Sequence, residues 1–234
     1  MRNSSRSRNG DLQTEDIRFA PAYALAHVAR YLNIPDRTVR NWFRGANRGR
    51  PVLALAQRGQ PYASFMGLTE AHILSAIRTK HGVSLQRIRR AIDYLKRDFK
   101  SEHPLIDFRF KTNGIDLFVE EFGDIINVSR YGQVGMRDVL EIYLDRIERD
   151  DLGLPVRLFP FTQSDIKRDE RIITIDPSIA FGRPMIQRSG ITTRAIAERF
   201  KAGETISSLA EDFDRVVEEI EAAVRSELEL DAAA

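Results

Sequence analysis

The feature that most constrains this chain is an ungapped internal repeat between its first fifty residues and its C-terminal end. The matched pairs are Val28–Leu209, Ala29–Ala210, Leu32–Phe213, Val39–Ile220 and Trp42–Ala223. In each copy a small alanine is followed, ten and thirteen residues later, by apolar or small residues. A small residue in one helix allows a second helix to cross closely, and the later positions seat that second helix on the first. The repeat therefore predicts two pairs of helices, each joined by a tight turn.

Hydrophobic periodicity predicts the remaining elements of the first half. The expected helices cover 22–32, 36–44, 69–80 and a segment that begins after Ser84 and ends near Phe99. Gly59 and Pro61 mark a turn between two expected strands within residues 51–65. The fourth helix carries Arg87, Arg90 and Arg97 on its polar faces, and Ser84 is a favourable N-cap for it.

The period changes in the middle of the chain. Asn113-Gly114 separates two alternating apolar stretches, which is a strong signal for a β-hairpin. Further expected elements are a strand at "DIINV", a helix from Arg137 to Arg149, and strands at "LPVRLFPF" and "RIITI". Three helices then follow, at 192–201, 205–213 and about 216–229. The expected fold class is α+β and mainly α, with short antiparallel strands in the middle and a three-helix module at the C-terminus.

Charge is divided unevenly along the chain, although the net charge is only +2. Residues 1–100 hold 19 Lys and Arg against 7 Asp and Glu, whereas residues 101–234 hold 17 against 27. Residues 203–234 alone contain ten acidic and two basic side chains. Either both halves have ordinary solvated surfaces, or the basic half and the acidic half bind different partners.

The exposed positions of the two repeat copies carry opposite chemistry. In the first copy they are Arg37, Thr38, Arg40, Asn41 and Arg44, and in the second copy Arg215, Glu218, Glu219 and Glu221. Arginine can donate two hydrogen bonds to guanine, and asparagine can pair with adenine, whereas glutamate is repelled by phosphate. Only the first copy is therefore expected on DNA, with Arg44, Arg48 and Arg50 holding phosphates and Trp42 packed inside.

Motifs for catalysis or for cofactor binding are missing from the sequence. There is no cysteine, no Walker lysine loop, no GxGxxG after a strand and no HExxH. The four histidines are widely spaced, and Asp150-Asp151 and Glu218-Glu219 have no companion ligand at a motif spacing. No enzyme, cofactor or metal site is expected, and no apolar run is long enough for a membrane span. Residues 1–17 are expected to form a disordered basic arm, and the lack of cysteine favours a reducing cytoplasm as the location.

Two stretches resemble known families. "YALAHVARYLNIPDRTVRNWFRG" resembles the first helix-turn-helix of MerR-type regulators, and "LTEAHILSAIRTKHGVSLQRIRRAIDYL" is similar to the helices that follow it in that winged domain. "IDPSIAFGRPMIQRSGITTRAIAERFKAGETISSLAEDF" resembles a helix-turn-helix module found in bacterial antitoxins. In this order the two resemble large VapB-type antitoxins, which are encoded beside PIN-domain ribonuclease toxins. The chain departs from the module at Gln187-Arg188-Ser189, where a Gly or Ala would permit a tight turn.

The resemblance implies an antitoxin of a type II toxin–antitoxin system that neutralises a VapC-type toxin and binds operator DNA to repress its own operon. It implies a MerR-like domain at 18–103, a possible dimerisation region at 104–175 and an acidic module at 176–234, within a homodimer. Glu211, Glu218, Glu219 and Glu221 are the expected toxin-binding residues. Two alternatives remain open: a MerR-like regulator that responds to a small ligand bound in the middle region, and a nuclease with clustered carboxylates there.

Overall fold

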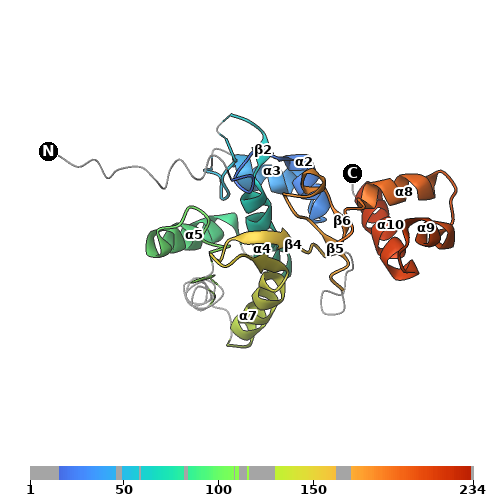
Figure 1. Cartoon of the computed structure of the whole chain (residues 1–234). Coiled ribbons are helices and arrows are strands. Elements are labelled where there is room, and N and C mark those ends of the chain that lie inside the picture. The colour runs from blue at the N-terminus through green and yellow to red at the C-terminus, as the bar shows by residue number, and fades with distance from the viewer. Residues whose placement is uncertain are drawn as a thin grey trace.

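The computed structural model describes residues 16–45, 49–57, 59–81, 84–107, 109, 110, 115, 130–161 and 170–232, with 79–81, 130–135 and 229–232 described by their backbone alone. The chain is mainly helical with short antiparallel strand pairs, as the expected α+β class requires. Three C-terminal helices lie together at one end of the molecule (Figure 1). No helix among the described residues is both long and apolar enough to cross a bilayer.

The first repeat copy consists of α2 (Leu25–Tyr31) and α3 (Asp36–Arg44). The bounds of α3 are those that the sequence predicts. Helix α2 begins later than expected because Tyr23 and Ala24 form strand β1, which pairs with β2 (Tyr62–Ala63) in antiparallel register.

The prediction of two neighbouring strands within residues 51–65 is wrong for its first strand. The backbone N–H groups of Val52 and Leu53 both donate to the Trp42 carbonyl, at 2.8 and 3.0 Å, and both side chains are buried. Their apolar character therefore serves to cover the C-terminal end of α3, and the second expected strand pairs with β1 instead.

Helix α4 (Phe65–His81) runs through the centre of the main hydrophobic core, with α5 (Leu85–Phe99) and α7 (Arg130–Leu144) around it (Figure 1). It begins four residues before the predicted start, and every residue from Phe65 to Ile77 is buried. Helix α5 follows Ser84 as predicted, and α7 packs along α4. The core that these helices share extends from Tyr23 to Ile175.

The middle of the chain differs from its sequence pattern in two places. Asn113-Gly114 and "DIINV" lie outside the described residues. Arg109, Phe110 and Ile115 lie within the stretches predicted as the hairpin strands and are helical, so the hairpin prediction is wrong at these residues. The predicted helix Arg137–Arg149 ends at Leu144, and β3 (Ile147–Arg149) pairs instead with β4 (Pro155–Leu158).

A tight turn explains the hairpin between β3 and β4. The Asp150 carboxylate accepts hydrogen bonds from the backbone N–H groups of Leu152 and Leu154, and Gly153 has a φ of 79°. Asp and Gly are the residues that such turns favour, so this local signal outweighs the helical period of the residues before it.

The C-terminal part begins with β5 (Ile173–Thr174) and β6 (Met185–Ile186), which pair antiparallel. Helices α8 (Thr193–Lys201), α9 (Ile206–Phe213) and α10 (Val217–Ala232) follow. Thr192 and Thr205 cap α8 and α9 by accepting from Ala195 and Ser208 N–H groups. The three helices, together with Ile173 of β5 and Ile186 of β6, enclose a second, smaller core.

The turn after β6 contains the predicted departure from the antitoxin module. Arg188 adopts a left-handed φ of 58°, a conformation that favours glycine. Ser189 supports this turn, because its hydroxyl donates to the Ile186 carbonyl and accepts from the Ile191 N–H. The tight turn therefore forms although no Gly or Ala is present at 187–189.

One ion pair joins the two ends of the chain. The buried Glu227 carboxylate on α10 lies 2.5 Å from Arg30 on α2, and it accepts a hydrogen bond from the Thr193 hydroxyl on α8 at 2.5 Å. A second contact is made by Gly182, where an added Cβ would lie only 2.1 Å from the Tyr23 hydroxyl oxygen. The ion pair thus joins the two repeat copies directly, and the Gly182 contact joins the segments that precede them.

Candidate nucleic-acid interface

The two repeat copies have the same turn, hydrogen bond for hydrogen bond. In the first copy Asn33 has a φ of 50°, and the Ile34 N–H donates to the Ala29 carbonyl at 2.9 Å. In the second copy Asp214 has a φ of 52°, and the Arg215 N–H donates to the Ala210 carbonyl at 2.9 Å. Each pair of residues is related by the alignment found in the sequence.

The inner faces also correspond. The buried members of the matched pairs are Val28 and Leu209, Ala29 and Ala210, Val39 and Ile220, and Trp42 and Ala223. Leu32 and Phe213 are both half-buried. The predicted repeat is therefore confirmed in turn geometry and in burial, and the prediction that Trp42 faces inward is confirmed by an exposure of 1%.

Helix α3 presents a polar face made by five of the predicted DNA-binding residues. Arg37, Arg40 and Arg44 are exposed, whereas Thr38 and Asn41 between them are half-buried. The Arg40 guanidinium pairs with Asp36 one turn earlier, and both side chains are about half exposed. An exposed pair of this spacing contributes about 0.3–0.5 kcal/mol to stability, so it orients Arg40 but is weak enough to be replaced by another partner.

The Arg50 side chain pairs with α5, while its backbone lies beside Gly45 at the end of α3. Its guanidinium lies 3.2 Å from the Asp93 carboxylate on α5, and its carbonyl accepts from the Arg89 guanidinium at 2.6 Å. Arg48 lies outside the described residues. Arg50 therefore belongs to a second basic surface beside α5.

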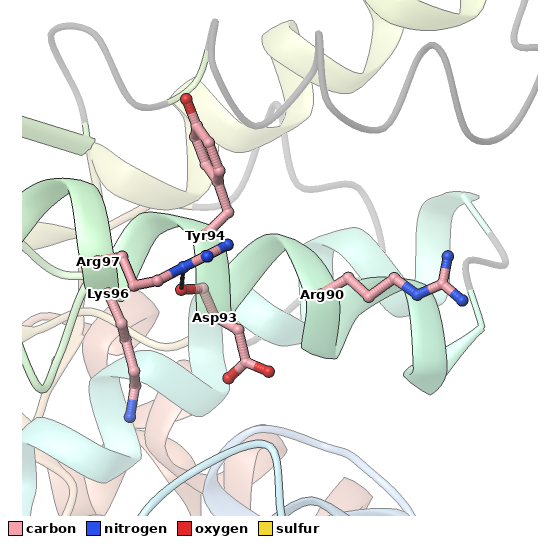
Figure 2. A pocket seen from close by; sticks show the side chains of 5 residues that line it. All are labelled: Arg90, Asp93, Tyr94, Lys96 and Arg97. Carbon is pink, nitrogen blue, oxygen red and sulfur yellow. Dashed lines mark hydrogen bonds between the residues drawn. The ribbon is translucent and has the colours of Figure 1, made fainter.

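Helix α5 forms most of that second surface. Arg90, Asp93, Tyr94, Lys96 and Arg97 line a hollow along this helix. In Figure 2 Arg97 reaches back to Asp93, whereas Arg90 and Tyr94 point away from it. Arg90 and Arg97 are exposed, and the Arg97 Nε–H donates to the Asp93 carbonyl at 3.3 Å. The sequence indicates the arginines of this helix, but the roles of Arg89 and Asp93 in positioning Arg50 have no signature, because the contact joins residues about forty positions apart.

The corresponding face of the second copy is acidic. Glu218, Glu219 and Glu221 on α10 occupy the positions of Arg37, Thr38 and Arg40 on α3. Glu218 and Glu221 are exposed, as is Glu211 on α9, and Glu219 is half-buried. Two helix pairs with the same turn thus present opposite charge at equivalent positions.

The histidines have structural environments. Burial lowers the pKa of His72 to about 3, and this side chain hydrogen-bonds to the Tyr143 carbonyl and stacks on Phe161. His103 lies 2.9 Å from the buried Glu70 carboxylate, and His27 stacks on Tyr31. In the part of the chain that the structure describes, no three His, Cys, Asp or Glu residues gather as a metal site requires.

Comparison with known proteins agrees with this geometry. Residues 21–92 match a family described as "Putative DNA-binding HTH domain", and residues 173–225 match a protein family of unknown function, DUF433. "Putative antitoxin VapB45" of Mycobacterium tuberculosis is 30% identical, over 87% of this chain and 92% of its own length. The uncharacterized protein Rv2308 of the same organism is 26% identical, over 92% and 93%.

A solved structure shares the fold. The crystal structure of Rv2018 from Mycobacterium tuberculosis superposes with a TM-score of 0.66 at 23% identity, covering 88% of this chain and 98% of that one.

Proposed function

The chain belongs to the family of "Putative antitoxin VapB45". From that premise we propose that it is a DNA-binding antitoxin, without catalytic activity, that neutralises a PIN-domain ribonuclease toxin and represses its own operon. The observation that carries the proposal is the charge-inverted repeat. One helix pair is suited to DNA and its counterpart, with the same turn, is suited to a basic protein.

The DNA half of the proposal assigns α3 to the major groove. Arg37, Arg40 and Asn41 contact bases, with Thr38 beside them, and Arg44 holds phosphate. Arg40 leaves Asp36 at a cost of about 0.3–0.5 kcal/mol, whereas a bidentate contact to guanine is worth about 1–3 kcal/mol. The contact to DNA therefore outweighs the ion pair.

Arg48 and Arg50 are proposed to hold phosphates beside this helix. The Arg50 guanidinium and the Asp93 carboxylate lie 3.2 Å apart and are both well exposed, so their ion pair is weak and screened by salt. Residues 18–103 then form a MerR-like unit in which the segment that folds back from α3 to β2 takes the place of a wing. A homodimer would supply two such units to a two-fold operator.

The toxin half assigns Glu211, Glu218, Glu219 and Glu221 to a basic partner surface. A ribonuclease must attract RNA, so the rim of its active site is expected to be basic. Carboxylates that cover the rim compete with RNA and accelerate association through charge complementarity. Residues 176–234 act as this module, with α8, α9 and α10 as a three-helix helix-turn-helix unit that has lost its attraction to DNA.

The test uses the full chain in two assays. Binding to its own promoter across a series of salt concentrations should weaken about 5–100-fold in Arg40→Ala, since one base contact is lost. The control Arg194→Ala removes an exposed arginine that pairs with Glu198 on α8 and should bind as the parent does. Capture of the PIN-type protein encoded beside the gene tests the second half. Unchanged promoter binding by Arg40→Ala, or no capture, contradicts the corresponding half.

A further inference from the structure

The turn between α9 and α10 contains a surface hollow. Its lining residues are Ala210, Glu211, Asp214, Arg215, Val216 and Glu219. At the equivalent place in the first copy, Ile34 follows the turn and packs against the main core. Arg215 occupies this position in the second copy and is half-buried, so a charged residue replaces the apolar one that packs inward in the first copy.

Two valines beside the hollow have no internal role. Val216 is 60% exposed and Val217 is 40% exposed, and neither belongs to the cores among the described residues. Their counterparts are Pro35 and Asp36, which suit the first turn of a helix. Valine is neither a favourable N-terminal residue nor a strong helix former, so helix formation does not account for the pair.

Carboxylates surround these valines. Glu211, Asp214 and Glu218 are exposed, and Glu219 lines the hollow. Arg215 contributes the single positive charge of the lining. An apolar spot inside an acidic ring excludes acidic and nucleic-acid partners, and it complements a segment that has an apolar side chain between lysines or arginines.

The hollow is also formed in advance. Asp214 holds its left-handed conformation, the Arg215 N–H closes the turn onto Ala210, and Leu209 and Ile220 anchor the two helices in the small core. A surface that needs little ordering on binding retains more of its contact energy as affinity.

We propose that this hollow, the α9–α10 turn site made by its six lining residues together with Val217 and Glu218, is the docking point of the toxin. Its occupant is a short basic segment of that protein, with one apolar side chain on Val216 and flanking cations on Glu211, Asp214 and Glu218. The inference rests on the proposed function and makes it specific, because it adds an apolar anchor to a charged surface.

The experiment measures association and dissociation rates of the full chain with the neighbouring PIN-type protein. Val216→Ser should weaken binding about tenfold, mainly through faster dissociation, because it removes an anchor. The double variant Glu211→Lys and Glu218→Lys should lower the association rate, and this effect should shrink as salt is raised.

Matched controls change equally exposed residues elsewhere. Leu152→Ser removes a side chain that is 80% exposed in the β3–β4 turn, and Glu141→Lys reverses an exposed charge on α7. Both should bind as the parent does, and all variants should melt at the parent temperature because the changed side chains are outside the cores.

The outcomes distinguish the docking point from the antitoxin function. Loss in Val216→Ser but not in Leu152→Ser supports the docking point. If the parent binds the toxin and Val216→Ser binds it equally well, the docking point is wrong and the antitoxin function stands. If the parent does not bind the toxin at all, both proposals fall. Association that requires a second copy of this chain, or DNA, at the same site would also overturn the assignment of the occupant.

Discussion

The α2–α3 pair and the α9–α10 pair have the same turn and opposite surfaces. Asn33 and Asp214 are the left-handed residues, Ala29 and Ala210 accept the closing hydrogen bond, and the hydrogen bonds of the turn recur at matched positions. Outside this frame almost every exposed charge differs. A few inner positions therefore define the helix pair, and the outer face is free to determine the partner.

The two copies also differ in how deeply they are embedded. The first copy is part of the large core that reaches Ile175, whereas the second shares a small core with α8 and β6. Trp42 and Ala223 occupy the same position, yet one fills a deep site and the other lets α10 lie close to α8. If the copies are equivalent only in backbone and turn, changes at matched inner positions should have unequal effects on stability.

Truncation of Trp42 and of its counterpart Ala223 should lower the free energy of unfolding by unequal amounts. Trp42→Ala empties a fully buried site and should lower the free energy of unfolding by about 3–5 kcal/mol. Ala223→Gly removes only a methyl group within a helix and should cost about 1 kcal/mol. Chemical denaturation of the two variants measures both values. Trp42→Phe is the control for DNA contact, since strong loss of promoter binding with unchanged stability would show that the indole touches DNA instead.

The pH dependence of stability should come from the larger core, because all four histidines lie in the first half of the chain. Burial lowers the pKa of His72 to about 3, so below the ordinary value of 6.5 the unfolded chain binds a proton that the folded chain does not. Stability is therefore lost as pH falls, by about 2 kcal/mol at pH 5. Denaturation of the parent and of His72→Gln between pH 7 and 5 should show this slope only in the parent.

His103 produces the opposite slope on the alkaline side. Burial alone would lower its pKa, but the Glu70 carboxylate more than compensates and the net pKa is raised. The protonated pair contributes its full stability below about pH 6.5, and that contribution is lost as pH rises through the raised folded value. His103→Gln should flatten this limb. A parent whose stability stays constant from pH 6 to 9 would contradict the assignment.

Loss of the Arg30–Glu227 ion pair between the two copies should have an intermediate effect on stability. Glu227→Gln retains an acceptor for Thr193 but removes the charge that faces Arg30, whose side chain is 34% exposed and can be hydrated again. A fully buried pair would cost about 3–5 kcal/mol to break, so this partly exposed one should cost about 1–2 kcal/mol. Glu221→Gln on the same helix is the control, and calorimetry should place it within about 0.5 kcal/mol of the parent. Equal melting of the two variants would mean that the ion pair does not hold the copies together.

The sequence carries the repeat and its surface chemistry because both depend on local spacing. The helical bounds of α3 and the caps Thr192 and Thr205 follow from side chains within a few residues of one another. The partner of β2 does not, because Tyr62 and Ala63 pair with residues about forty positions earlier. The contacts of Arg50 with α5 and of Glu227 with α2 also join residues far apart in the sequence, so local patterns do not predict them. The β3–β4 hairpin was predictable in principle, since Asp150 and Gly153 are turn residues that the helical period obscured.

The finest test of the comparison replaces the two turn residues. Asn and Asp tolerate the left-handed conformation better than other residues with a Cβ, because their short polar side chains can hydrogen-bond locally. Asn33→Ala and Asp214→Ala should each lower the free energy of unfolding by about 0.5–1 kcal/mol, which is below the full cost of about 1–2 kcal/mol for a left-handed residue. The two losses should agree to within about 0.5 kcal/mol, because the turns have matching φ values and matching hydrogen bonds. Asn33→Gly and Asp214→Gly are the matched controls and should cost less than the alanine variants, because glycine adopts this φ freely. If one alanine variant is as stable as the parent while the other loses 1 kcal/mol or more, the two turns are not energetically equivalent, and the repeat extends only to the path of the backbone.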